Sequence, residues 1–214
     1  MPIVLREILV GSTRFNDIQR GIPRMSPSLL SRRLGELVHA GIVERRPIQR
    51  GKGSEYHPTE AGEALRPVIL GMAEWAQNWS RDELTADENL DVDVLMWDMR
   101  RTVDGSGIPT ADRYVAQFEF SGVPVKKRRY WLLFDRGEID LCQKDPGYEI
   151  GVILHSHIRT MVQVWLGHIP LRTAIREEKL RIDGSRRDVK AFQAWFTRSI
   201  VSGYADPANT HVKH

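Results

Sequence analysis

The 214-residue sequence predicts an α+β protein: an N-terminal winged helix-turn-helix, then a second α+β domain whose helices gather on one face of an antiparallel sheet. Three observations favour this fold class. Residues 12–62 follow the order helix, turn, helix, wing. Residues 115–154 hold four strand-like runs separated by turn signals. Amphipathic helical patterns follow from residue 158 onward.

The second helix of the N-terminal part is expected to run from Pro27 to about Ala40. Ser26 is a favourable N-cap, Pro27 suits the first helical position, and Gly41 is a typical stop signal. Apolar residues recur at helical spacing and should face the core: Leu30, Leu34, Leu37 and Val38. The opposite side is small or polar and carries Ser28, Arg32, Gly35 and His39, flanked by Ser31 and Arg33.

This polar side suits the reading of bases in the DNA major groove. Arginine binds guanine through two hydrogen bonds, and serine can donate to or accept from several bases. We therefore predict four base-reading residues: Ser28, Ser31, Arg32 and Arg33. Taken alone, the helix is equally well explained as an ordinary solvated amphipathic helix. The wing that follows it favours the DNA-binding interpretation.

The wing consists of a strand-like IVERRP, a basic glycine loop RGKGS and a second strand-like EYHPT. Positive charge is concentrated in this part of the chain. Residues 1–52 hold 10 Lys and Arg against 4 Asp and Glu, whereas residues 53–100 hold 3 against 11. Such segregation indicates a polyanionic partner, here double-stranded DNA. Phosphate and wing contacts are expected from Arg14, Arg20, Arg24, Arg46, Arg50 and Lys52.

A further helix should begin with Thr59 as its N-cap and extend to about Trp79, with a kink or an interruption at Pro67. Its apolar set consists of Ala61, Leu65, Val68, Met72, Trp75 and Trp79. Two interpretations of this set stay open. It either contributes to a dimer interface, or it packs on the winged helix or on the next domain.

The N-terminal part resembles the HxlR-type winged-helix regulators from about Ile3 to Trp79. The match rests on LREILVGSTRFNDIQRGIPRMSPSLLSRRLGELVHAGIVERR followed by EYHPTEAGEALRPVILGMAEWAQNW. Its most specific parts are the R-F-N-x-I step at Arg14, the turn Met25-Ser26-Pro27, the L-x-x-R-L-x-x-L helix and the Y-x-x-T-x-x-G wing exit. The resemblance implies a DNA-binding transcriptional regulator, usually a homodimer on an inverted repeat, without enzymatic activity.

Members of that family carry a further helix, and the first half of the next one, before the segment LREILVG. The resemblance therefore implies a start upstream of Met1 or a truncated copy. We expect the loss to leave one apolar side uncovered, the side that carries Ile3, Leu5, Ile8 and Leu9.

The division expected from composition is a DNA-binding domain over 1–80, an acidic linker over 81–93, a second domain over 94–201 and a flexible tail over 202–214. The second domain should open with a helix over 94–101. Four strands over 115–120, 128–134, 138–144 and 149–154 then form an antiparallel meander. Helices near 158–166 and 171–180, an edge strand over 180–184 and a last helix through Phe196 complete it.

This domain is similar to the sterol-carrier-protein-like lipid-binding fold over about 92–200. The similarity rests on Trp131-Leu132-Leu133, the stretch 140–147, Val164 to Gly167, and Leu180 to Gly184. It implies an apolar cavity for a hydrophobic small molecule, where each buried methylene contributes about 0.8 kcal/mol. The expected cavity neighbours are Trp131, Leu133, Met161, Trp165, Trp195 and Phe196. For any one of them, plain core packing is the commoner explanation.

No strong catalytic constellation is present in the sequence. Cys142 lies within a strand pattern and is expected to be a small buried hydrophobe. His155 and His157 lack a third ligand, so we expect neither a metal nor another cofactor. No apolar run is long enough for a membrane helix, and the start is not a signal peptide, which predicts a cytoplasmic protein. The alternative to a regulator is a lipid-binding carrier or interaction module with a degenerate DNA-binding unit.

Overall fold

The computed structural model describes residues 1–48, 53–103, 108, 113–196, 199 and 202. The chain divides into two compact units, Met1–Trp75 and Ala76–His214. We call them the first and the second unit. The boundary lies inside a helix, whereas composition placed it after residue 80.

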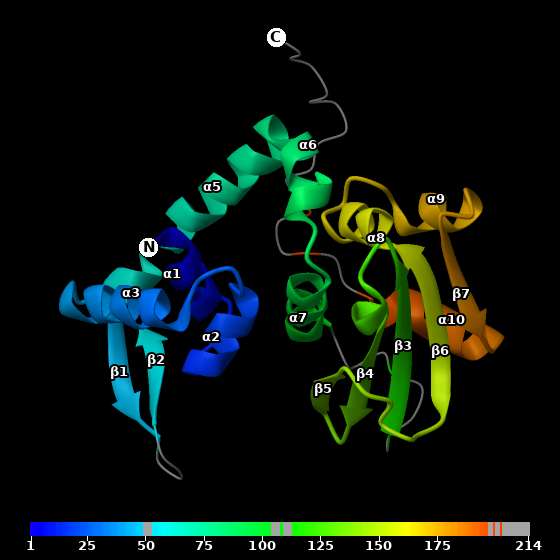
Figure 1. Ribbon diagram of the computed structural model, residues 1–214, viewed down its shortest axis with the longest axis horizontal. Coiled ribbons are helices and arrows are strands. Elements are labelled where there is room, and N and C mark those ends of the chain that lie inside the picture. The colour runs from blue at the N-terminus through cyan, green and yellow to red at the C-terminus, as the bar shows by residue number, and fades with distance from the viewer. Residues whose placement is uncertain (49–52, 104–107, 109–112, 197–198, 200–201, 203–214) are drawn as a thin grey trace. The chain divides into compact units, whose positions relative to one another are not determined.

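The first unit has the helix, turn, helix, wing order that the sequence predicts (Figure 1). Its elements up to the wing are α1 (Pro2–Leu9), α2 (Phe15–Gly21), α3 (Pro27–His39), β1 (Val43–Pro47) and β2 (Ser54–Pro58). The two strands pair antiparallel, with Val43 opposite Pro58 and Pro47 opposite Ser54. An isolated bridge between Arg14 and Glu55 ties the segment before α2 to the wing.

Helix α3 forms where the sequence predicts it. The Ser26 side chain accepts a hydrogen bond from the Leu29 amide at 3.3 Å, and Gly41 takes a left-handed φ of 68° beyond the helix end. Its inward side is buried in the core of the first unit through Leu30, Leu34 and Leu37.

The apolar side of α1 is largely covered, which corrects the expectation that its four apolar residues lie open. Leu5, Ile8 and Leu9 are buried in the same core as α3. Among the four, only Ile3 is exposed, with 47% of its surface accessible. Helix α1 packs against both α2 and α3, and that packing supplies the cover.

The helix after the wing is interrupted, as Pro67 predicts. A short α4 (Glu60–Glu63) is followed by α5 (Arg66–Trp79), and Pro67 takes the second position of α5. Leu65 and Ile69 pack against the core of the first unit.

The second unit contains a five-stranded sheet in the order β5-β4-β3-β6-β7. Its strands are β3 (Arg113–Ser121), β4 (Arg129–Asp135), β5 (Glu138–Cys142), β6 (Ile150–His157) and β7 (Leu180–Gly184). The expectation of a purely antiparallel meander was wrong, because β6 pairs parallel with β3. The sheet is therefore mixed.

The chain geometry explains this difference. The β4–β5 hairpin turns through Arg136 and Gly137, which both have positive φ, as a tight two-residue hairpin loop requires. Residues 143–149 then carry the chain from the β5 edge past β4 and β3 to the far side of β3. The turn signal at 145–147 marks a change of direction but does not specify the next strand partner.

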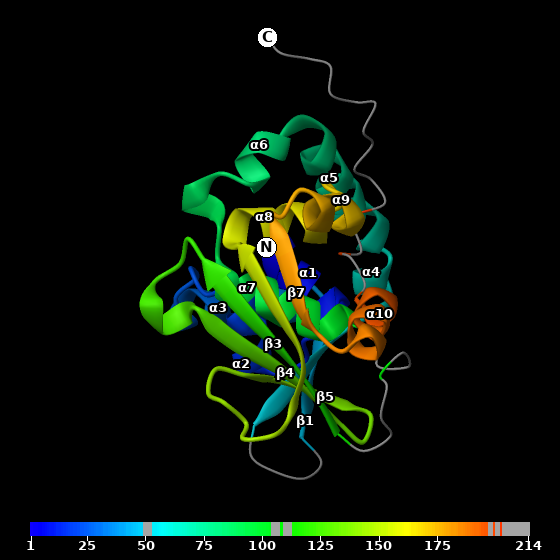
Figure 2. The same ribbon diagram turned by 90° about the vertical axis from the view of Figure 1, so that its right-hand side faces the viewer.

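Helices cover one face of this sheet, as predicted for the fold class. The strands on that face form a single core cluster with α7 (Val92–Thr102), α8 (Ile158–Trp165), α9 (Leu171–Arg176) and α10 (Arg186–Trp195). Figure 2 shows α8 and α9 at one end of the strands. The β3–β4 connection contains a 3-10 turn, Val125–Lys127.

The acidic segment expected as a linker has structure of its own. It carries α6 (Arg81–Leu84) and a 3-10 turn, Asp87–Asn89, and the Asp91 side chain caps α7. Acidic residues are common in linkers, but they are also favoured in the first turn of a helix. Composition alone therefore did not distinguish the two. In the described part of the chain, no helix is long and apolar enough to cross a membrane.

Candidate nucleic-acid interface

The outward side of α3 presents the residues that the sequence selected for base reading. Ser28, Ser31 and Arg32 are exposed, and Arg33 is partly covered at the edge of the helix. Gly35 lies on the same side and has no heavy atom within 4 Å of the position that a Cβ would take. Gly35 therefore adds no side chain to the exposed side of the helix between Arg32 and His39.

Glu36 holds both arginines of this surface and was not among the predicted site residues. Its carboxylate lies 2.7 Å from Arg33 Nη1 and 3.8 Å from Arg32 Nε. The hydrogen bond from Arg33 lowers the pKa of Glu36, with smaller contributions from the charges of both arginines. The i,i+3 and i,i+4 spacing of this triad was a sequence signal for the contact.

Four of the predicted phosphate-contacting cations are exposed in the first unit: Arg14, Arg20, Arg24 and Arg46. Arg14 lies 3.5 Å from Glu55, Arg20 lies 3.6 Å from Asp17, and Arg46 pairs with Glu44. Such surface pairs contribute little stability, so a phosphate can replace the carboxylate. Arg50 and Lys52 lie outside the described residues.

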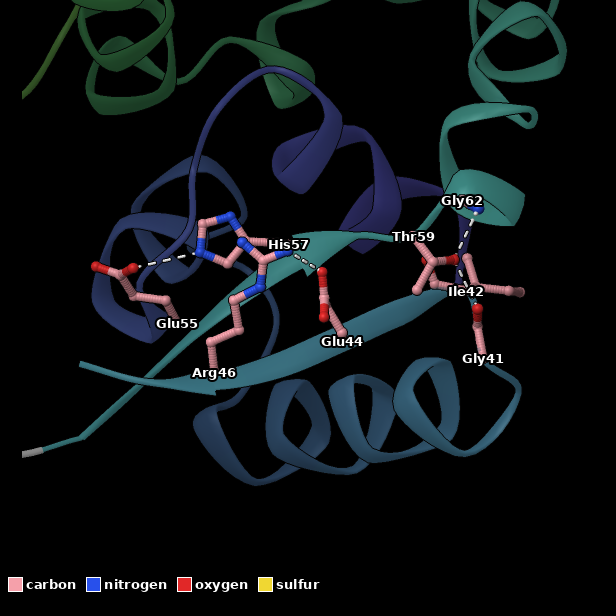
Figure 3. A network of polar contacts seen from close by, with 8 residues as sticks. All are labelled: Gly41, Ile42, Glu44, Arg46, Glu55, His57, Thr59 and Gly62. Carbon is pink, nitrogen blue, oxygen red and sulfur yellow. Dashed lines mark hydrogen bonds and ion pairs between the residues drawn. The ribbon is translucent and has the colours of Figure 1, made fainter. Parts of the chain in front are cut away.

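Thr59 fixes the position of the wing against the end of α3 (Figure 3). Its hydroxyl approaches the carbonyl oxygens of Gly41 at 2.6 Å and Ile42 at 3.1 Å, and it accepts from the Gly62 amide at 3.2 Å. A Cβ at Gly62 would overlap the Ile42 carbonyl oxygen. The wing exit T-E-A-G therefore combines a helix cap with a close backbone approach that only glycine allows.

Helix α5 carries an exposed apolar stripe, which we define as Val68, Met72, Trp75 and Trp79. These residues follow at intervals of four, three and four, so they lie along one side of the helix. More than half of each residue's surface is exposed. Among the described residues, none of the four belongs to the core of either unit.

The six residues expected at a ligand cavity are divided between the two faces of the sheet. Four belong to the core cluster on the helix-covered face: Met161, Trp165, Trp195 and Phe196. Trp131 and Leu133 alternate along β4 with the core residues Tyr130, Leu132 and Phe134, so they face the other side. There the Trp131 indole donates to Gln117 Oε1 at 2.9 Å. Five of the six residues are buried and Leu133 is partly exposed. The period of the strand separates Trp131 and Leu133 from the other four.

Comparisons with known proteins identify the first unit. Residues 1–84 match the family model described as HxlR-like helix-turn-helix. The chain is 36% identical over 80 residues to YvaP of Bacillus subtilis, which is named an uncharacterized HTH-type transcriptional regulator. That alignment covers 37% of this chain and 74% of YvaP. The chain belongs to the HxlR-like helix-turn-helix family. A second B. subtilis protein with that kind of name, YdeP, is 32% identical over 78 residues, which cover 36% of this chain and 61% of YdeP.

Solved structures show weaker likenesses that extend over the second unit. Sterol carrier protein 2 from Yarrowia lipolytica is 11% identical, with a TM-score of 0.34, over 48% of this chain and 93% of that protein. The sec-alkylsulfatase Pisa1 from Pseudomonas sp. is 17% identical, with a TM-score of 0.40, over 54% and 17%. At these values neither likeness carries an argument about function. The α+β architecture of the second unit rests on its own strand order.

The three reactive side chains singled out in the sequence are Cys142, His155 and His157. Cys142 is only partly buried, which corrects the expectation of a buried residue. This partial burial, and to a lesser extent the charge of Asp140, raises the pKa of the Cys142 thiol, which disfavours the nucleophilic thiolate. His155 lies 3.2 Å from Glu119 and 3.0 Å from Asp183, and His157 accepts from the Arg159 amide. Among the described residues, no group of three or more His, Cys, Asp and Glu side chains is placed to hold a metal ion.

Proposed function

We propose that this protein is a sequence-specific transcriptional regulator that binds double-stranded DNA as a homodimer, and that its second unit binds a hydrophobic small molecule. The observation that carries the proposal is the exposed polar side of α3 beside a wing that Thr59 ties to the same helix. Membership of the HxlR-like family supports it. Catalysis is not part of the proposal, since the family relatives are named as regulators.

In this proposal the N-terminal half of α3 enters the major groove. Ser28 and Arg32 are four residues apart, so both can reach the same stretch of base edges. Arg32 leaves Glu36 to bind guanine, while Arg14, Arg20 and Arg24 bind phosphates on either side. Two copies related by a two-fold axis would read an inverted repeat whose half-sites lie about 34–36 Å apart.

The test is a fluorescence-anisotropy titration of the protein against the DNA upstream of its own coding sequence and a scrambled duplex, at two salt concentrations. We expect binding to the upstream DNA at least ~1000-fold tighter than to the scrambled duplex. Arg32→Ala should weaken specific binding about 5- to 150-fold and relax the preference at one base position. Lys52→Ala should weaken both complexes alike and reduce the salt slope by about 1.

Arg176→Ala provides the matched control, because it removes the same charge from an exposed site in the second unit. Its binding should equal that of the wild type. If Arg32→Ala behaves like this control, the assignment of the base-reading surface is wrong. Equal, steeply salt-dependent binding to both duplexes would indicate a merely basic surface. No binding at all would favour a lipid-binding carrier or an interaction module with a degenerate DNA-binding unit.

A further inference from the structure

Two neighbouring hydrogen-bond donors of the second unit lie buried without a partner among the described residues. They are the hydroxyl of Tyr114, at the start of β3, and the indole N–H of Trp195, at the end of α10. Tyr114 is 5% exposed and Trp195 is fully buried. Neither atom has a hydrogen-bond partner within the described part of the chain. Buried polar groups are nearly always hydrogen-bonded, so two such atoms in one core point to an absent partner.

The two rings are neighbours in the same aromatic group. The Tyr114 and Trp195 rings meet edge to face with centroids 6.5 Å apart. Phe134 lies 6.1 Å from Tyr114 and 5.1 Å from Trp195, and Phe192 lies 4.8 Å from Trp195. These phenylalanines supply apolar surface but no acceptor. A bound molecule that supplies an acceptor here has to be compatible with an aromatic, apolar environment.

Glycine permits the observed position of the tyrosine. A Cβ at Gly151 of β6 would overlap the Tyr114 ring. The ring therefore lies directly over the β6 backbone, and a larger residue at 151 would displace it. Gly151 thus leaves the space against β6 that the phenol ring occupies.

Nearby charge limits the kind of acceptor that fits. Burial, and secondarily the negative charge of Asp188 on α10, raises the pKa of Tyr114 well above its ordinary value. The hydroxyl thus remains protonated and able to donate. The same carboxylate would repel an anionic head group, whereas it leaves a neutral oxygen unaffected.

We propose that the second unit binds a neutral apolar molecule through an accepting oxygen, such as an ester, ketone or alcohol oxygen, to which Tyr114 and Trp195 donate. Phe134 and Phe192 contact the hydrocarbon next to that oxygen. This assignment rests on the proposed function, in which the second unit binds a hydrophobic small molecule, and specifies its chemical class and its polar contacts.

Four probes with the same chain length and different ends test the assignment on the full chain. Equilibrium binding of tritiated hexadecan-1-ol is measured and is competed with methyl hexadecanoate, hexadecanoate and hexadecane. We expect the alcohol and the ester to bind at least ~10-fold tighter than the alkane and the carboxylate. The ester is the decisive probe, because it accepts hydrogen bonds but cannot donate them.

Two substitutions separate the donor role from packing. Tyr114→Phe removes only the hydroxyl and should weaken the alcohol and the ester about tenfold while leaving the alkane unchanged. It should melt no lower than the wild type, since it deletes an unpaired buried group. Asp188→Asn should improve the binding of hexadecanoate relative to the ester, and it tests the charge argument even if Tyr114→Phe folds poorly.

The possible results separate a failure of the donor pair from a failure of the hydrophobic-ligand function. If the wild type binds none of the four probes, the hydrophobic-ligand function fails and this assignment fails with it. If all four bind equally and Tyr114→Phe changes nothing, the ligand function stands and the donor pair is overturned. Equal weakening of all probes by Tyr114→Phe, alkane included, would show a structural role and also overturn it.

Discussion

Single atoms decide how the wing of this protein is held. Thr59 has one hydroxyl, yet that hydroxyl joins the end of α3, the exit of β2 and the start of α4. Gly62 makes the arrangement possible because its Cα faces the Ile42 carbonyl oxygen without space for a methyl group. Because these contacts are so close, even the addition of one methyl group at Gly62 should disturb them.

Gly62→Ala should destabilise the protein by about 1–3 kcal/mol, because the added methyl displaces a backbone carbonyl in the region that joins α3 to the wing. Gly71→Ala is the matched control. Gly71 lies inside α5 with nothing within 4 Å of its Cβ position, so alanine there should stabilise by about 0.5–1 kcal/mol. Thermal or urea unfolding of both variants measures the difference. Equal effects of the two substitutions would contradict the role assigned to Gly62.

At this scale the sequence predicted which side of α3 is exposed, because helical periodicity alone determines that. It did not predict that Glu36 already holds Arg32 and Arg33, since those contacts depend on rotamers as well as on spacing. The sequence also did not predict that the donors Tyr114 and Trp195 lack acceptors among the described residues. Trp195 was expected beside a cavity or in the core, but whether its indole N–H finds an acceptor depends on three-dimensional packing.

At the scale of helices and strands, periodicity located nearly every element but did not predict which strands pair. The strands of the second unit begin and end close to their expected positions, yet the parallel pairing of β3 with β6 was missed. Pairing is chosen by residues distant in sequence, and a pattern along one strand does not name its neighbour. The same holds for helix α5. Its apolar stripe can be read from the sequence, but the sequence does not identify what packs against it.

We expect the stripe on α5 to form the homodimer contact. The double variant Met72→Ala, Trp75→Ala removes its central side chains, each of which stabilises an interface by about 1.5–3 kcal/mol when fully buried. The variant should sediment as a monomer at concentrations where the wild type is a dimer. Its melting temperature at monomeric concentrations should be nearly unchanged, because these side chains are exposed within the chain.

Glu74→Ala is the control for this experiment, since Glu74 is exposed on the same helix outside the stripe. It should leave the dimer intact. A wild type that sediments as a monomer at all accessible concentrations, or a double variant that still dimerises, would require another explanation for the stripe. Loss of dimerisation should also weaken binding to an inverted repeat far more than binding to a single half-site.

At the scale of the whole molecule, α5 belongs to both units. Near its start, Arg66 Nη1 donates to the Leu9 carbonyl in the first unit at 2.9 Å. Near its end, the buried Gln77 donates to the Leu166 carbonyl and accepts from His168 Nε2 at 2.6 Å in the second unit. Burial and the charge of Arg81 lower the pKa of His168 to about 4, so near neutral pH the ring is uncharged. The Gln77 side-chain oxygen can only accept, so the proton of the neutral His168 ring lies on Nε2.

We expect the proposed ligand of the second unit to act on DNA binding through α5, because this helix continues from one unit into the other. We expect saturating methyl hexadecanoate to change the affinity for the upstream DNA about 5- to 150-fold, and that DNA to change the affinity for the ester by the same factor. Gln77→Ala should bring both factors toward one, because it releases the end of α5 from His168 and Leu166. Anisotropy titrations with and without the ester, and ester binding with and without DNA, measure the two factors. If the ester binds and the DNA affinity does not change, the two units work independently, since a ligand that binds both states equally shifts neither.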